Sequence, residues 1–202
     1  QAHLREIEQQ IRSHPLIHVF TRATLVDFSG YKGNFTAQIM LAPGAVTRTI
    51  ECGVAIVATG AQEMKPKEYR YGEDPRIMTQ LELEEKMADR PDEIAGARQI
   101  VMIQCVGSRE PGHPSCSRIC CQEAVKNALK IKELNPDAQV VVLYRDMRTY
   151  GFMEEYYTRA RGMGVIFIRY EPESKPQVEL EDGRISVKLT DPSLMQPVHL
   201  QP

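Results

Sequence analysis

The chain has 202 residues, 42% of them hydrophobic, which suits one or two domains with a buried core. A formal net charge of −2 and the lack of a basic cluster argue against a nucleic-acid-binding protein. The longest apolar run, Gly53 to Ala61, is far shorter than the ~20 residues of a membrane-spanning helix, so no direct membrane span is expected.

The first part of the chain predicts a helix followed by strands. Residues 2–13 carry apolar side chains at helical spacing, and the His14-Pro15 step ends the helix. Strand composition follows at residues 17–28 and 33–41, with a Pro-Gly turn after the second strand.

The run from Glu51 to Gly60 is nearly all apolar, which is typical of a strand buried on both faces of a parallel sheet. Cys52 stands near its start and is expected to be a small core residue. Residues 61–75 are polar and predict a linker, which leads into a short helix at residues 79–89 and a break at 91–96.

A strand–helix–strand–helix–strand pattern comes next. The expected strands are 98–107, 138–147 and 165–170, and the expected helices are 116–134 and 153–164. Such a unit predicts a parallel sheet with right-handed crossovers. Ser115 or Ser117 is a candidate cap for the first helix. Asp182-Gly183 predicts a hairpin near the C-terminus.

Four of the five cysteines, Cys105, Cys116, Cys120 and Cys121, follow the first strand of this unit. A dinucleotide-binding unit has a glycine-rich phosphate loop here, but the chain contains no G-x-G-x-x-G. Cys105 ends the strand, Cys116 and Cys120 are expected on one helix face, and Cys121 is rotated by about 100°. A helix N-terminus favours thiolates, so the four sulfurs are expected to converge on one ligand.

Four convergent thiolates suit an iron–sulfur cluster or a zinc ion. The adjacent pair Cys120-Cys121 favours a [4Fe–4S] cluster, because structural zinc sites usually use separated cysteines. A redox disulfide such as Cys105–Cys116, or four reduced structural thiols, are the remaining alternatives. The low, odd cysteine count does not suit a disulfide-rich secreted protein, and a cytoplasmic location is expected.

Two other groups of side chains lie near these cysteines in the sequence. His113 is expected to be an exposed loop histidine, with a hydrogen bond to a metal ligand as the alternative. Arg145, Asp146 and Arg148 follow the second strand and are expected to be a charged strand end at the surface. The alternative for them is a nucleotide ribose or phosphate contact.

At these residues the sequence resembles the A-type subunits of heterodisulfide reductase and related subunits of quinone-interacting oxidoreductase complexes. The matching runs are IQCVGSRE, CSRICCQEAVKNALKIKELNPDAQVVVLYRDMRTYG, HPLIHVFTRATLVDFSGYKGNFTAQI, GVAIVATG and EYRYGEDPRIMTQLELEEKM. The resemblance spans residues 4–190, and the cysteine segment is its most specific part.

The resemblance implies that Cys105, Cys116, Cys120 and Cys121 hold a [4Fe–4S] cluster close to a flavin. It also implies an α/β, thioredoxin-reductase-like fold, in which a Rossmann-like βαβαβ unit interrupts an FAD domain that has antiparallel strands. Ala58, Thr59 and Gly60 match the segment that passes close to FAD. The domains expected on this basis are a partial FAD-binding domain (1–62), a linker with a short helix (63–96), a Rossmann-like domain (97–172) and a hairpin returning toward the FAD domain (173–202).

The chain lacks the family's N-terminal glycine motif and its second strand-glycine motif, so a central fragment of a longer flavoprotein is expected. The implied function is an oxidoreductase in which the cluster relays electrons between FAD, bound in the longer parent, and other subunits of a complex. A dithiol/disulfide oxidoreductase of the pyridine-nucleotide class and a zinc-stabilised structural module are the alternatives. A homodimer is left open.

Overall fold

The computed structural model describes residues 2–202, and its contacts divide the chain into two compact units, Gln1–Ala61 and Gln62–Pro202. Each unit is described by itself. The model contains helices with both parallel and antiparallel sheets, so the predicted α/β class is confirmed.

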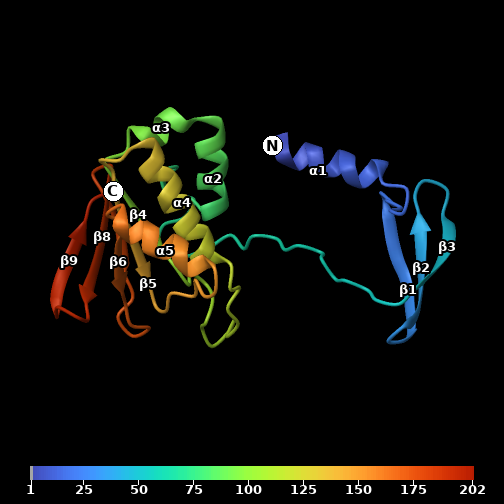
Figure 1. Ribbon diagram of the computed structural model, residues 1–202. Coiled ribbons are helices and arrows are strands. Elements are labelled where there is room, and N and C mark those ends of the chain that lie inside the picture. The colour runs from blue at the N-terminus through green and yellow to red at the C-terminus, as the bar shows by residue number, and fades with distance from the viewer. Residues whose placement is uncertain (1) are drawn as a thin grey trace. The chain divides into compact units, whose positions relative to one another are not determined.

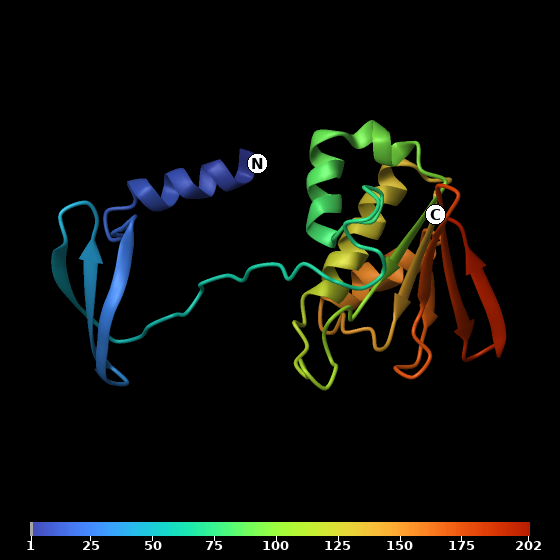
Figure 2. The ribbon, with the colours of Figure 1, turned by 180° about the vertical axis from the view of Figure 1, so that it is seen from behind.

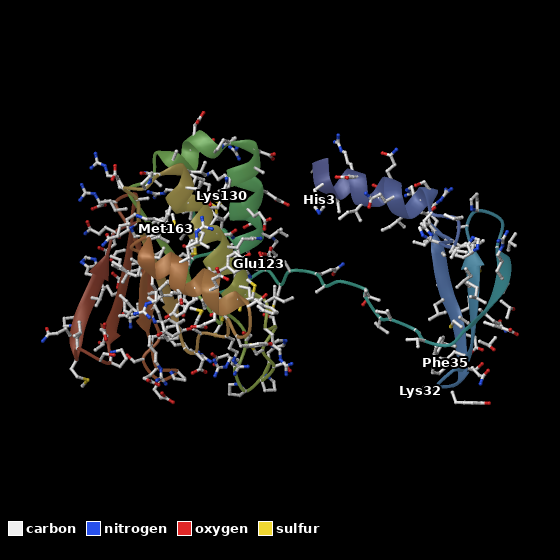
Figure 3. The ribbon with its side chains drawn as sticks, in the orientation of Figure 1. His3, Lys32, Phe35, Glu123, Lys130 and Met163 are labelled. Carbon is white, nitrogen blue, oxygen red and sulfur yellow. The ribbon has the colours of Figure 1, made fainter. Side chains whose placement is uncertain are left out.

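The first unit consists of a helix and an antiparallel sheet (Figure 1). Its elements are α1 (Ala2–Ser13), β1 (Ala23–Tyr31), β2 (Asn34–Leu41) and β3 (Val46–Cys52), with the strands in the order β1-β2-β3. The turn between β1 and β2 is the one at which Figure 3 labels Lys32 and Phe35. The predicted helix is confirmed, but the first strand starts at Ala23 rather than at residue 17.

The apolar run after β3 does not form the expected buried strand. Residues 53–61 have no regular structure, and Val54, Ile56 and Val57 are exposed. A strand buried on both faces needs neighbouring strands for its backbone and layers for its side chains. No strand among the described residues pairs with this run, which is bonded to the sheet only at its start, where the Gly53 carbonyl accepts the Gly33 N–H at 3.0 Å. Cys52 is accordingly a half-buried residue at the end of a mostly exposed strand, and the expectation that it is a core residue is wrong.

The second unit contains the predicted strand–helix alternation. Its elements up to the last parallel strand are α2 (Gln80–Asp89), α3 (Pro91–Ala95), β4 (Gln99–Ile103), α4 (Cys120–Leu134), β5 (Gln139–Tyr144), α5 (Met153–Gly162) and β6 (Ile166–Arg169). The strands pair in parallel in the order β4-β5-β6, which confirms the parallel sheet. The break expected at residues 91–96 is instead the short helix α3, since Pro91 occupies its first turn, where a missing N–H costs nothing.

Three more strands complete this unit as an antiparallel sheet, β7 (Gln177–Glu181), β8 (Arg184–Asp191) and β9 (Gln196–Leu200). The predicted Asp-Gly hairpin joins β7 and β8, whereas β9 was not predicted. Figures 1 and 2 show helices on one side of the parallel sheet and the antiparallel strands on the other.

Alternating side chains of the parallel strands create two apolar cores. Met102, Val140 and Val142 pack with α4 and its neighbours, while Val141 and Leu143 pack with the antiparallel sheet. Both faces of β5 are therefore buried, which explains its uninterrupted apolar sequence. This sandwich fixes the carboxyl edge of β4 and β5, where the cysteine loop begins. Among residues 2–202, no helix has the length and apolar character needed to cross a membrane.

Candidate cysteine site

The loop that joins β4 to α4 begins with backbone strain. Cys105 directly follows the sheet and has a φ of 61°, and Arg109 and Arg118 have φ values of 60° and 62°. The left-handed region costs a non-glycine residue about 1 kcal/mol or more, so three such residues in one short loop need contacts that hold them there. Those contacts are made by sulfur atoms and by charged side chains.

Three of the four cysteines, Cys105, Cys120 and Cys121, lie near one another at the start of α4, the helix end marked by Glu123 in Figure 3. The neighbouring side chain of Cys121 is the main reason that the pKa of Cys120 falls to about 6, against the opposing effect of burial. The Ser117 hydroxyl and the backbone N–H groups of Cys105 and Cys121 lower it further. Cys120 is therefore the thiolate of this group at neutral pH.

Cys121 and Cys105 are buried and keep their protons. The neighbouring Cys120 side chain, followed by burial, raises the pKa of Cys121, whose Sγ donates to the carbonyl of Asp146 at 3.7 Å. Burial raises the pKa of Cys105, and a hydrogen bond from Arg109 opposes that rise. The group therefore combines one thiolate with two protonated neighbours, so that no two of its sulfurs carry a negative charge side by side.

Cys116 is not part of this group. Its Sγ accepts the backbone N–H of Arg118 at 3.4 Å, and α4 begins only at Cys120. The expected placement of Cys116 and Cys120 on one helix face is therefore wrong, because the left-handed backbone at Arg118 interrupts the helical path between them. Neither predicted serine caps the helix, since Ile119 occupies that position without a side-chain hydrogen bond.

Charged side chains tie this loop to the ends of the parallel strands. Arg109 donates to the Cys105 sulfur at 3.9 Å and to the Asp146 carboxylate at 2.6 Å. Arg145 donates to the carbonyl of Arg109 at 3.0 Å and forms an ion pair with Glu110. The loop is thus held at Arg109 and Glu110 by two residues that directly follow β5.

Arg145 differs from its predicted role as a charged strand end at the surface. It is only 5% exposed, because Glu110 covers it and its guanidinium lies over the ring of Tyr170. His113 is an exposed loop residue, as expected, and its backbone bridges to Glu110. The sequence analysis missed Arg109, because its partner Asp146 follows a different strand and the path of the cysteine loop cannot be predicted from periodicity.

The candidate flavin contacts are Ala58, Thr59 and Gly60, which lie in the exposed segment at the end of the first unit. The four cysteines of the loop belong to the second unit. Gly60 has a φ of 68°, which a glycine tolerates. Their role in flavin binding stays a prediction.

The donor chemistry of the loop fits an iron–sulfur cluster. All four candidate ligands are unpaired thiols, the donors that such clusters use. Buried polar atoms without partners occur in residues next to the loop, namely both amide atoms of Gln104, which precedes Cys105 in the chain, and the Nε of Arg145. Within residues 2–202, no three His, Cys, Asp or Glu side chains are placed to hold a metal ion, so a cluster requires all four cysteine sulfurs to come closer together.

Comparison with known proteins gives this loop a family context, although no protein-family model matches the chain. The chain is 38% identical over 171 residues, 75% of its length, to the first iron–sulfur A-type subunit of the CoB–CoM heterodisulfide reductase of Methanopyrus kandleri. It is 41% identical over 139 residues, 61% of its length, to the A-type subunit of the H2/formate:CoB–CoM heterodisulfide, ferredoxin reductase of Methanococcus maripaludis.

A third relative is the A-type subunit of the ferredoxin/F420H2-dependent CoB–CoM heterodisulfide reductase of Methanosarcina acetivorans, 40% identical over 134 residues and 59% of the chain. The chain spans 25%, 21% and 17% of the lengths of these three relatives. Over most of its residues, the chain is therefore homologous to a part of the A-type subunits of heterodisulfide reductases.

Proposed function

We propose that this chain is part of an electron-transferring oxidoreductase that resembles the A-type subunits of heterodisulfide reductases, and that Cys105, Cys116, Cys120 and Cys121 hold a [4Fe–4S] cluster. The observation that carries the proposal is the group of sulfurs at the start of α4, where Cys105 and Cys121 lie near enough to Cys120 to shift its pKa and all four candidate ligands are unpaired thiols. A relative whose name describes it as an iron–sulfur protein supports it.

The protein supplies the environment of such a cluster. Burial of Cys105 and Cys121 keeps water from two of the ligands, and the N-terminus of α4 stabilises the negative charge on Cys120. When bound, a [4Fe–4S] cluster supplies a one-electron carrier whose reduction potential depends on nearby charges, hydrogen bonds and solvent. No side chain has to transfer a proton for this role.

The proposal includes the thioredoxin-reductase-like fold and its division into residues 1–62, 63–96, 97–172 and 173–202. The parallel sheet with helices on one face supports the Rossmann-like part. Ala58, Thr59 and Gly60 contact FAD in the complete flavoprotein, and the cluster passes electrons between that FAD and other subunits. The names of the relatives, which identify them as components of reductase complexes, support such partners, and a cytoplasmic complex is proposed.

Metal analysis tests this proposal. After anaerobic purification and reconstitution, we expect about four irons and four sulfides per chain, with broad absorption near ~400 nm. Cys120→Ser removes the proposed thiolate ligand and should lose the iron and the colour. Cys52→Ser is the matched control, since Cys52 lies at the end of β3 in the first unit, and it should keep both. One zinc per chain without colour would instead identify a structural zinc module.

A dithiol oxidoreductase is the second candidate, favoured by the low pKa of Cys120 beside the protonated Cys121. A thiolate next to a resolving thiol is the arrangement needed for exchange with a disulfide substrate. This function predicts a reversible loss of two titratable thiols on oxidation, without iron. Retention of four irons in the reconstituted chain would exclude it.

A further inference from the structure

We propose that the Arg109–Asp146 pair sets the reduction potential of the cysteine site, with Arg109 raising it and Asp146 lowering it. This inference rests on the proposed function and names the residues that adjust it. Neither residue is a ligand. Both act through charge beside the sulfur of Cys105.

The geometry assigns Arg109 two contacts at once. One amino group of its guanidinium lies 3.9 Å from the Cys105 sulfur, and the other lies 2.6 Å from the Asp146 carboxylate. The Arg109 side chain is 23% exposed, and that of Asp146 is 49% exposed. The positive charge is therefore screened less by water than the negative charge that balances it.

Asp146 is also linked to the sulfur group through its backbone. Its carbonyl accepts the Cys121 thiol, so a single residue after β5 contacts one cysteine directly and a second through Arg109. The left-handed backbone of Arg109 is held in place by the hydrogen bond from Arg145 to its carbonyl. Fixed positions matter here because an interaction between charges falls with distance.

The sign of the effect follows from the charge of the electron. Reduction makes the site more negative by one unit, so a nearby positive charge favours the reduced form and raises the potential. A nearby carboxylate does the opposite. Arg145 is the other cation near Cys105, but its guanidinium donates to the Arg109 carbonyl and pairs with Glu110, whereas Arg109 donates to the sulfur itself.

Redox titration of the reconstituted full chain tests the inference, with the potential followed by electron paramagnetic resonance and iron measured in every sample. Arg109→Gln removes the positive charge and should shift the one-electron equilibrium about tenfold toward the oxidised form, or about 59 mV. Asp146→Asn should shift it in the opposite direction. Arg159→Gln is the control, since its partner Glu133 lies on the exposed surface of α4 and α5.

Opposite shifts in the two variants, with full iron content and an unchanged control, support the inference. A potential equal to that of Arg159→Gln in either iron-replete variant overturns it and leaves the cluster proposal standing. If Arg109→Gln loses its iron, the shift of the reduction potential in Asp146→Asn tests the inference by itself. If the unsubstituted chain itself binds no iron, the result contradicts the proposed function rather than this inference.

Discussion

Arg145 is the residue whose surroundings differ most from what its sequence position suggests. A charged residue after a buried strand is normally expected at the surface. Here the guanidinium is buried by the cysteine loop, with Glu110 and the carbonyl of Arg109 as its partners. Sequence patterns do not contain this information, because the loop has no periodicity from which its path could be predicted.

Replacing Arg145 should loosen the cysteine loop. Arg145→Met keeps the apolar stem but removes the contacts to Arg109 and Glu110. We expect a loss of roughly 2 kcal/mol in the free energy of unfolding, less than for a fully buried pair because Glu110 keeps Lys175. Urea unfolding measures the loss, and faster tryptic cleavage after Arg109 or Arg118 reports the loosened loop.

The control for this prediction is Arg159→Met, in which an arginine that is 55% exposed loses an ion pair on the surface. Exposed pairs contribute about 0–1 kcal/mol, so stability and cleavage should stay close to those of the unsubstituted chain. Equal effects of both substitutions would mean that Arg145 does not hold the loop.

The cysteines show how far residue-scale prediction can go. Spacing in the sequence placed Cys105 near a strand end and Cys120 and Cys121 near a helix start, and both are confirmed, although β4 already ends at Ile103 and α4 begins only at Cys120. It failed for Cys116, since a continuous helix was assumed across Arg118, whose φ of 62° is incompatible with one. A left-handed arginine carries no signal comparable to that of a glycine or a proline.

At the scale of elements, helix α2 has the most complete set of end contacts in this unit. Thr79 and Glu82 form a capping box, and Glu82 also accepts hydrogen bonds from Lys65 and Tyr71. Burial by itself would raise the pKa of Glu82, but the hydrogen bonds from Lys65, the Thr79 backbone and Tyr71 outweigh it and lower the pKa to about 2. The start of α2 is therefore stabilised by an ionised carboxylate.

This carboxylate predicts a specific dependence of stability on acid. A folded-state pKa below the ordinary value of 4.5 gives stability that is present above about pH 4.5 and is lost as the pH falls toward 2. Glu82→Gln should lower the free energy of unfolding by about 1 kcal/mol at pH 7, with a difference that shrinks on acidification. Urea unfolding at pH 7, 4.5 and 3 measures it.

Glu84→Gln, on the same helix, is the control for the acid prediction. Its carboxylate pairs with Lys126, and both side chains are nearly half exposed. The prediction fails if Glu82→Gln and Glu84→Gln change the free energy of unfolding by the same amount at every pH.

The sequence predicted helices and strands correctly where the burial of apolar side chains alone determines the element. Apolar periodicity located α4, α5 and the parallel strands, because each of them buries a regular set of side chains in one of the two cores. The apolar pattern did not predict β9, because its alternation of apolar and polar side chains is limited to Val198 and Leu200. It misassigned residues 53–61, since an apolar run becomes a strand only when other strands pair with it.

At the scale of the whole molecule, the two units differ in how they bury apolar side chains. Both apolar cores identified among residues 2–202 draw all their members from the second unit. In the first unit, Leu25, Val26 and Phe28 of β1 are exposed, and among the residues of this unit whose burial is described, only Ala37 and Ile39 on β2 are buried. The second unit therefore contains the apolar burial that drives folding.

This difference predicts that residues 62–202 fold without the first unit. The parallel sheet has apolar layers on both faces within this segment, and both sets of partners of β5 are present. We expect a cooperative thermal transition by circular dichroism, at a midpoint within a few degrees of the corresponding transition of the full chain. Val142→Ala, which opens a cavity beside α4, should lower that midpoint by about 4–8 °C or more in both proteins.

A protein made of residues 62–202 also isolates the cysteine site, because all four candidate ligands lie within this segment. Reconstituted residues 62–202 should bind the same amount of iron as the full chain, since the contacts of Cys105, Cys120 and Cys121 are made inside this unit. Iron content and the visible spectrum measure this. A folded segment that binds no iron, beside a full chain that does, would show that residues 1–61 contribute to the site.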